Sequence, residues 1–264
     1  MTVSKLAFAG LAVALGAVGA AAVVHAQQPK YTLHVYDHCP FCNRVEWLMQ
    51  QFGINYERVV YGYGAGADPE KCSGHGYGTG PLPLTGKKML PVLEGQGVPC
   101  APGARGQPES MEICSFLIAR HRLVAPCDSG RDDVKKITAE LTALKPALVE
   151  DRLVKMPIYD WADARDVAYR RYKKKLPIEV PPITAQPEEI AQLNAKLAEL
   201  PALLKGHDKG APCLNEWGWG MDDVLLLPLL RAFTCVKGAV FPPAVEAYLN
   251  IEATQMTDYR KHAV

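Results

Sequence analysis

The sequence of 264 residues contains one pattern whose residue types and spacing carry chemistry by themselves, Cys39-Pro40-Phe41-Cys42. Two cysteines separated by two residues occur in redox-active dithiols and also as one half of a zinc site. A tetrahedral zinc site needs two further ligands, and the sequence has neither a second Cys-x-x-Cys nor paired histidines at ligand spacing. We therefore expect Cys39 and Cys42 to form a redox-active dithiol, and we expect no metal.

The segments on both sides of Cys39 predict how it is activated. Residues 31–37 alternate apolar and polar side chains, as a short strand does, and apolar residues at 45, 48, 49 and 52 predict a helix that Gly53 ends. Cys39 then lies at the helix N-terminus, where unpaired N–H groups and the helix dipole favour the thiolate. Pro40, which has no N–H, suits the first helical turn. We predict that Cys39 is the nucleophile and that Cys42, with a higher pKa, is the resolving thiol.

The following residues extend this unit into an α/β domain. Residues 54–60 predict a second strand, and a strand–helix–strand unit is usually parallel. The stretch 61–86 is rich in glycine and has no apolar period, so it is interpreted as a flexible insert. Residues 88–94 predict a third strand that contains Pro91, and Glu109-Ser110 opens another helix.

From about residue 131 the pattern is helical throughout. Candidate helices cover residues 132–154, 158–174, 187–205, 222–236 and 242–256, with a proline-rich linker at 176–186. The predicted organisation is an α/β domain over residues 30–122, with the insert at 61–86, followed by an all-α domain over residues 131–264. Asp222 and Asp223 are interpreted as a capping pair at the start of their helix.

Composition excludes two classes of protein. With 48% hydrophobic and 22% charged residues, the chain is not largely disordered. Its formal net charge of +1 gives no bulk attraction to a polyanion, so we expect no nucleic-acid partner. The run Lys173-Lys174-Lys175 is interpreted as a solvated helix face.

The first 26 residues are interpreted as a segment apart from the fold. One lysine precedes an uncharged stretch at 6–24, and Val24-His25-Ala26 offers a cleavage site after Ala26. We favour a secretory signal peptide, and hence export to the periplasm or to a secretory-pathway lumen. A retained membrane anchor through residues 6–24, or an organellar address, stays open as the alternative.

The six other cysteines carry weaker expectations. Cys114 and Cys235 fall on predicted helices among apolar neighbours and are expected to be buried thiols. Cys72, Cys100, Cys127 and Cys213 fall in loop-like segments, where Cys72–Cys100 or Cys127–Cys213 disulfides are open in an oxidising compartment.

Four motifs together resemble the glutaredoxin 2 family, glutaredoxins built like glutathione transferases. They are the stretch from Tyr36 to Cys42, the segment from Gly86 to Leu93, the turn Pro108-Glu109-Ser110, and the run from Asp222 to Arg231. The resemblance covers the chain from about residue 31 to its end and is least specific over residues 131–210. It implies a thioredoxin-like N-terminal domain followed by an all-α C-terminal domain.

The resemblance also implies roles for individual residues. Cys39 would attack protein or mixed glutathione disulfides, and glutathione would serve as co-substrate. The glutathione-binding residues would be Pro40, Phe41, Lys88, Leu90, Pro91, Glu109 and Ser110. Leu90 would pair through its backbone beside a cis-Pro91, Lys88 would meet a glutathione carboxylate, and Glu109 and Ser110 would hold the γ-glutamyl end at a helix N-terminus.

Two further functions remain open at this point. The same build is used by glutathione transferases and dehydroascorbate reductases, although these reactions do not need a resolving thiol such as Cys42. A non-catalytic protein that binds glutathione and an iron–sulfur cluster is the other alternative, against which the rigid Pro40 counts. The long insert and the export-like N-terminus depart from the family, and an oxidising compartment puts the direction of the reaction in doubt.

Overall fold

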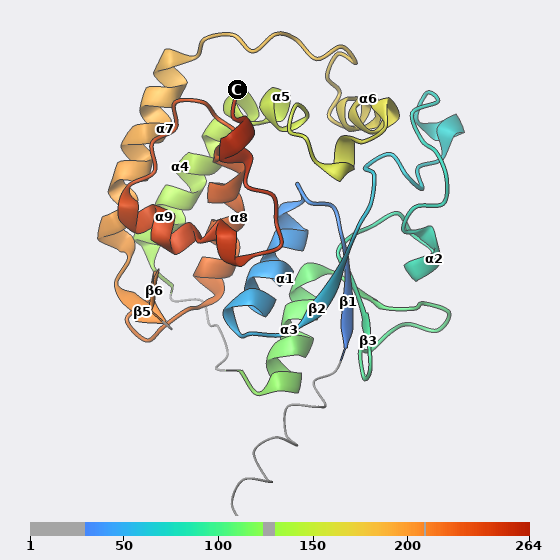
Figure 1. The fold of residues 1–264 in the computed structure, drawn as a ribbon, viewed down its shortest axis with the longest axis horizontal. Coiled ribbons are helices and arrows are strands. Elements are labelled where there is room, and N and C mark those ends of the chain that lie inside the picture. The colour runs from blue at the N-terminus through green and yellow to red at the C-terminus, as the bar shows by residue number, and fades with distance from the viewer. Residues whose placement is uncertain (1–29, 124–129, 209) are drawn as a thin grey trace, which may run out of the picture.

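The computed structural model describes residues 30–123, 130–208 and 210–264. A small sheet with its helices forms one side of the molecule, and a helical domain packs against it (Figure 1). The predicted leader at 1–26 and Cys127 lie outside the described residues.

The N-terminal domain is built on a four-stranded sheet in the order β2-β1-β3-β4. Strand β1 (Tyr31–Val35) pairs in parallel with β2 (Tyr56–Val60) and antiparallel with β3 (Val92–Gly95), which pairs antiparallel with β4 (Gln107–Pro108). The predicted parallel strand–helix–strand unit is thus observed, with α1 (Pro40–Gln51) as its helix. The helix α3 (Ser110–His121) follows β4 and packs beside α1.

Helix α1 is buried on more than the single stripe that its apolar period predicts. Val45, Leu48 and Met49 are fully buried, as expected. Asn43 and Glu46 are also buried, because α8 (Met221–Phe233) of the helical domain packs against α1. One apolar core therefore runs through both domains.

The C-terminal domain consists mainly of helices that are shorter than predicted. They are α4 (Asp132–Leu148), α5 (Glu150–Leu153), the 3₁₀ turn Tyr159–Trp161, α6 (Ala164–Lys173), α7 (Pro187–Glu199), the 3₁₀ turn Leu200–Leu203, α8, α9 (Pro243–Leu249), and the 3₁₀ turns Ile251–Ala253 and Tyr259–His262. The prediction of an all-α domain is wrong in one detail, because β5 (Gly206–Asp208) and β6 (Ala211–Cys213) form a two-stranded sheet. Asp223 caps α8 as expected, since its carboxylate accepts from the N–H groups of Gly220 and Leu214.

The glycine-rich insert is ordered by contacts with the C-terminal domain, which corrects its interpretation as a flexible segment. It contains the short turn Pro69–Lys71 and the helix α2 (Leu82–Thr85), and it approaches α6 (Figure 1). The Asp166 carboxylate on α6 accepts hydrogen bonds from Gly64 N at 2.7 Å and from the Tyr77 hydroxyl at 2.8 Å. A Cβ atom on Gly64 would lie 3.0 Å from the carbonyl oxygen of His75. The glycine here permits close packing.

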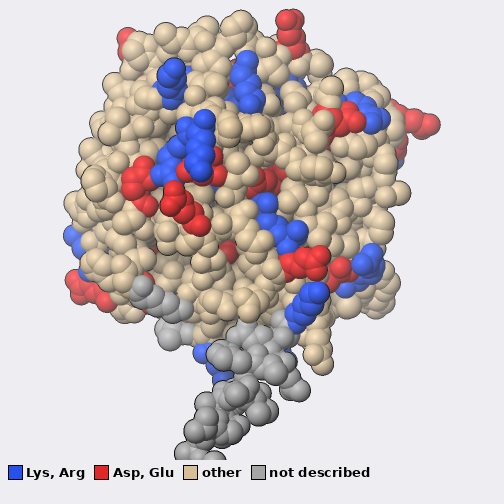
Figure 2. Space-filling view, in the orientation of Figure 1, with Lys and Arg blue, Asp and Glu red and all other residues tan. Residues whose placement is uncertain are grey.

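The surface charge and the apolar character of the helices are relevant to binding of nucleic acids and membranes. In Figure 2, basic and acidic side chains are interspersed on the face shown, and most of that surface carries neither. Within the described ranges, no helix has the length and apolar character needed to cross a membrane.

Candidate active site

The two cysteines of the predicted dithiol lie in contact at the start of α1, with different exposure. Cys39 is the N-cap residue and is partly exposed, whereas Cys42 is fully buried. The pKa of Cys39 is lowered, chiefly by a hydrogen bond from the Cys42 thiol and further by the N–H groups of Cys42 and Phe41, which together outweigh its burial. Burial and the neighbouring Cys39 sulfur raise the pKa of Cys42 well above its usual range. Cys39 is therefore the more acidic and more accessible thiol, as a nucleophile must be.

Cys39 opens into a cavity of about 440 Å³ between the two domains. The N-terminal domain contributes Tyr36, His38, Cys39, Pro40, Phe41, Tyr63, Lys88, Met89 and Leu90 to its lining. The helical domain contributes Lys145, Glu150, Leu153, Tyr169, Arg170, Lys173, Lys174, Pro228 and Ala232. The volume falls in the range of small-molecule sites.

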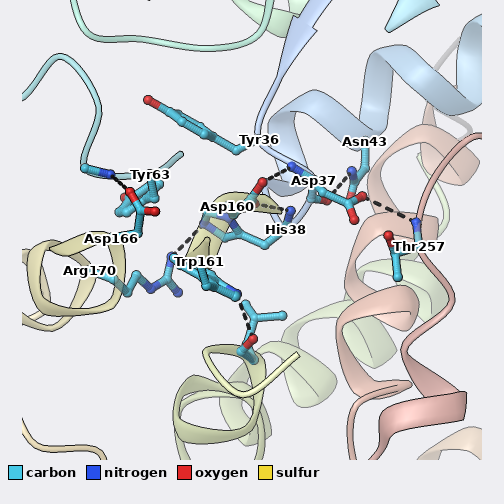
Figure 3. A network of polar contacts seen from close by, with 12 residues as sticks. Tyr36, Asp37, His38, Asn43, Tyr63, Asp160, Trp161, Asp166, Arg170 and Thr257 are labelled. Carbon is cyan, nitrogen blue, oxygen red and sulfur yellow. Dashed lines mark hydrogen bonds and ion pairs between the residues drawn. The ribbon is translucent and has the colours of Figure 1, made fainter. Parts of the chain in front are cut away.

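A buried network from the helical domain holds the residue that precedes Cys39 (Figure 3). The Asp160 carboxylate accepts from Asp37 N at 2.9 Å, from His38 N at 2.8 Å and from His38 Nδ1 at 2.5 Å. Burial lowers the pKa of His38 despite the Asp160 contact, so the ring is neutral. Its Nδ1–H then donates to Asp160, and its Nε2 accepts from Arg170 Nη1 at 3.0 Å. A single tautomer of His38 satisfies both contacts. Together with the backbone hydrogen bonds to Asp160, these contacts hold the backbone just before Cys39 in place.

A second buried network anchors Asp37, one residue further upstream. Arg231 on α8 donates to the Asp37 carbonyl at 2.6 Å and to its carboxylate at 2.8 Å, and Arg58 on β2 reaches the same carboxylate at 2.7 Å. Burial raises the pKa of Asp37, but the Arg231 and Arg58 guanidinium groups outweigh it and hold the pKa below its usual value. The loop before Cys39 is thus held from both domains.

Lys88 lines the cavity, and its contact with a glutathione carboxylate stays a prediction. Its Nζ donates to the Tyr36 hydroxyl at 2.9 Å and to the Tyr63 carbonyl at 2.5 Å. It also lies 4.7 to 5.0 Å from the ring centroids of Tyr36, Tyr63 and Tyr169. Burial lowers the pKa of Lys88 to about 8. The side chain is thus a partly buried cation among three aromatic rings.

The remaining candidate glutathione residues fall into two groups. Pro40, Phe41 and Leu90 line the cavity with Cys39, and the Phe41 ring is 51% exposed. The Leu90–Pro91 peptide bond is cis, and β3 pairing begins only at Val92.

The second group, Pro91, Glu109 and Ser110, lies just past the paired ends of β3 and β4, outside the cavity lining. Val92 on β3 pairs with Pro108 on β4, so Pro91, which precedes β3, and Glu109, which follows β4, both lie next to this pair. Ser110 is buried in the first turn of α3, and Glu109 is exposed. The strand pairing therefore brings the predicted γ-glutamyl position next to the cis-proline.

Sequence reasoning missed the half of the site that comes from the helical domain. Asp160 and Arg170 contact residues more than a hundred positions earlier in the chain. Tyr63 was not predicted as a site residue, because it lies in the glycine-rich insert that was interpreted as flexible. The run of aromatic and acidic residues at 159–166, which contains Asp160, is a local sequence feature of this part of the site, but it does not predict which residues Asp160 contacts.

The other described cysteines are free thiols. Cys72 is buried and donates to the Asp68 carbonyl, while Cys100 is an exposed free thiol, so the structure contains no Cys72–Cys100 disulfide. Cys213 is a buried free thiol in β6, and its suggested partner Cys127 lies outside the described residues. Cys114 is buried in α3, and Cys235 is buried in the turn that follows α8, so both thiols are buried as predicted but only Cys114 lies in a helix. In the part of the chain that the structure describes, no group of His, Cys, Asp and Glu side chains is arranged to hold a metal ion.

Comparison with known proteins identifies related folds. A family model described as "Glutaredoxin 2, C terminal domain" matches residues 133–263, and no curated protein matches the chain. Among solved structures, glutaredoxin 2 from Salmonella typhimurium in complex with glutathione is 20% identical with a TM-score of 0.64, over 89% of this chain and 99% of that one.

Two other solved structures are less similar. A glutathione S-transferase from the Antarctic clam Laternula elliptica is 17% identical with a TM-score of 0.43, over 84% of this chain and 87% of that chain. Dehydroascorbate reductase from Chlamydomonas reinhardtii is 19% identical with a TM-score of 0.40, over 88% of this chain and 91% of that chain. The Salmonella structure confirms the predicted fold class, a thioredoxin-like domain followed by a helical domain.

Proposed function

The chain belongs to the glutaredoxin 2 family, and from this premise we propose that it is a glutathione-dependent thiol–disulfide oxidoreductase. The observation that carries the proposal is the asymmetric dithiol. Cys39 has a lowered pKa and faces a cavity, whereas Cys42 is buried behind it with a raised pKa. This pairing suits a nucleophile and a resolving thiol.

With a glutathionylated substrate, the reaction needs one cysteine and one reductant. The Cys39 thiolate attacks the glutathione sulfur, a Cys39–glutathione disulfide forms, and the substrate leaves as a thiolate that takes a proton from water. A second glutathione thiolate then attacks the glutathione sulfur bound to Cys39. Glutathione disulfide leaves, and the Cys39 thiolate is restored.

With a protein disulfide, Cys42 completes the first half of the reaction. Cys39 attacks one sulfur and forms a mixed disulfide with the protein. Cys42, deprotonated as it attacks, displaces the protein thiolate and closes a Cys39–Cys42 disulfide. Two glutathione molecules then reduce that disulfide and leave as glutathione disulfide.

Glutathione is proposed to lie along the edge formed by Leu90, Pro91 and the Glu109-Ser110 turn. The backbone of Leu90 lies just beyond the β3 ladder, where it can pair with the cysteinyl part. The N-terminus of α3 offers N–H groups and the positive end of a dipole to the γ-glutamyl carboxylate. Pro40 and Phe41 would flank the sulfur. The solved complex of the Salmonella glutaredoxin 2 with glutathione supports this ligand.

The test is a glutathione-coupled disulfide reduction assay on variants of single cysteines. We expect Cys39→Ser to be inactive, and Cys42→Ser to reduce glutathionylated substrates but not protein disulfides. Cys100→Ser, which removes an exposed thiol that does not line the cavity, is the matched control and should retain full activity. Activity of Cys39→Ser equal to that of the parent would refute the proposal.

The same variants separate this function from the alternative of a transferase or dehydroascorbate reductase. Those reactions need a single thiol, so conjugation of an electrophile or reduction of dehydroascorbate that Cys42→Ser retains in full, together with poor reduction of every disulfide, would favour them. Visible absorbance of the purified protein would favour the iron–sulfur alternative.

A further inference from the structure

The cavity is strongly cationic, chiefly on the wall that the helical domain contributes. Five lysine or arginine side chains line the cavity, and one glutamate opposes them: Lys88, Lys145, Arg170, Lys173, Lys174 and Glu150. Four positive charges are left over, although the formal net charge of the whole chain is only +1. The run Lys173-Lys174-Lys175, interpreted above as a solvated helix face, contributes two of its three members to this lining.

The single carboxylate is already shared by two of these cations. Glu150 lies 2.7 Å from Arg170 Nη2 and 3.4 Å from Lys174 Nζ. In the described ranges no ion pair within 4.0 Å joins a carboxylate to the Lys145 or Lys173 ammonium group, and of these two lysines Lys145 is partly buried and Lys173 is exposed. Burial lowers the pKa of Lys145, even with Glu150 nearby.

An anion bound in the cavity would compensate this charge. A partly buried ammonium group without a partner loses hydration that no protein carboxylate replaces. A concave site lined by one sign of charge also concentrates ligands of the opposite sign. The space of about 440 Å³ suits a small molecule rather than a folded protein surface.

We propose that α4 and α6 form a subsite for a carboxylate-bearing half of the disulfide substrate. The inference rests on the proposed reduction of disulfides at Cys39, and it adds the class of disulfide that the protein prefers. The preferred substrates are small mixed disulfides of glutathione with an anionic thiol. Glu109 and Ser110 do not line this cavity, so the cationic wall is separate from the proposed γ-glutamyl position.

The test compares mixed disulfides of glutathione with three thiols of similar size and different charge. These are mercaptoacetate, which is anionic, 2-mercaptoethanol, which is neutral, and cysteamine, which is cationic. At low ionic strength we expect kcat/KM to fall in that order, with roughly tenfold between the anionic and neutral disulfides. High salt should reduce the difference.

Two double variants show whether the wall causes the preference. Lys145→Gln with Lys173→Gln removes the two ammonium groups that have no carboxylate partner. Lys135→Gln with Lys175→Gln is the matched control, because it removes one exposed lysine from α4 and one just after α6, neither of which lines the cavity. We expect the anionic-to-neutral kcat/KM ratio to fall toward one in the first pair and to stay at the parent value in the second.

The outcomes distinguish failure of this inference from failure of the proposed function. Equal kcat/KM for the anionic and cationic disulfides, with good turnover of the neutral one, would overturn the subsite alone. An unchanged ratio in the Lys145→Gln, Lys173→Gln variant would do the same. Absence of turnover for all three disulfides would overturn the proposed function and the subsite together.

Discussion

The hydrogen bond from the Cys42 thiol to the Cys39 sulfur is the largest influence that lowers the pKa of Cys39. Replacement of Cys42 by alanine removes this donor but leaves the N–H groups of the helix N-terminus in place. Replacement by serine keeps an O–H donor at the same position. We therefore expect the pKa of Cys39 to rise in Cys42→Ala and to stay low in Cys42→Ser.

The size of the effect follows from the energy of a hydrogen bond to a charged group, about 1.5–3 kcal/mol. Because Cys39 is partly exposed, the lower end applies. A free energy of about 1.4 kcal/mol corresponds to a factor of ten. At a pH below the pKa of Cys39 in both proteins, Cys42→Ala should contain roughly tenfold less thiolate than Cys42→Ser.

The assay is the rate of Cys39 alkylation by iodoacetamide as a function of pH, with ultraviolet thiolate absorbance as a second readout. Both variants should carry Cys100→Ser, because Cys100 is the exposed thiol that would otherwise react. Equal alkylation rates and equal titration curves in the two variants would refute the assignment of the Cys42 donor as the main cause.

Three further predictions follow from other contacts. Asp160→Asn places an amide where a buried carboxylate accepts from two backbone N–H groups and from His38. We therefore expect the free energy of unfolding, measured with urea, to fall by about 2–4 kcal/mol. An unchanged free energy of unfolding would contradict the role of this network. Tyr77→Phe removes the hydroxyl that donates to Asp166. Proteolytic cleavage within residues 61–86 should become faster, while the midpoint of global unfolding should not change. Equal cleavage rates in the variant and the parent would argue against attachment of the insert to α6 by this hydrogen bond. For the proposed export signal, N-terminal sequencing of the natural protein should begin after Ala26, and retention of Met1 would favour an anchor or another address.

The fold was predictable from local patterns. The alternating strand at 31–37, the apolar stripe after Cys42 and the helical periods beyond residue 131 each depend on near neighbours in the sequence. The observed limits are nevertheless shorter, because α4 gives way to α5 and the last turns become 3₁₀. The β5–β6 hairpin was missed because its strands have only three residues each.

The candidate site was predictable only in its N-terminal half. Cys39 and Cys42 follow from their spacing and from the helix that they begin. Asp160 and Arg231 do not, because each acts through a contact with Asp37 or His38 that packing of the two domains creates. The insert was misinterpreted since glycine gives no apolar period, whether it serves flexibility or, as at Gly64, close approach.

The central claim is that Cys39 is the thiol that exchanges with glutathione disulfide bonds. The most direct measurement is mass spectrometry of the Cys42→Ser variant after incubation with glutathione disulfide, followed by digestion and location of the adduct. Without the resolving thiol, the Cys39 thiolate should displace one glutathione and retain the other, so we predict a single glutathione on the peptide that contains Cys39. An unmodified Cys39, with glutathione on Cys100 or on no cysteine, would contradict the account.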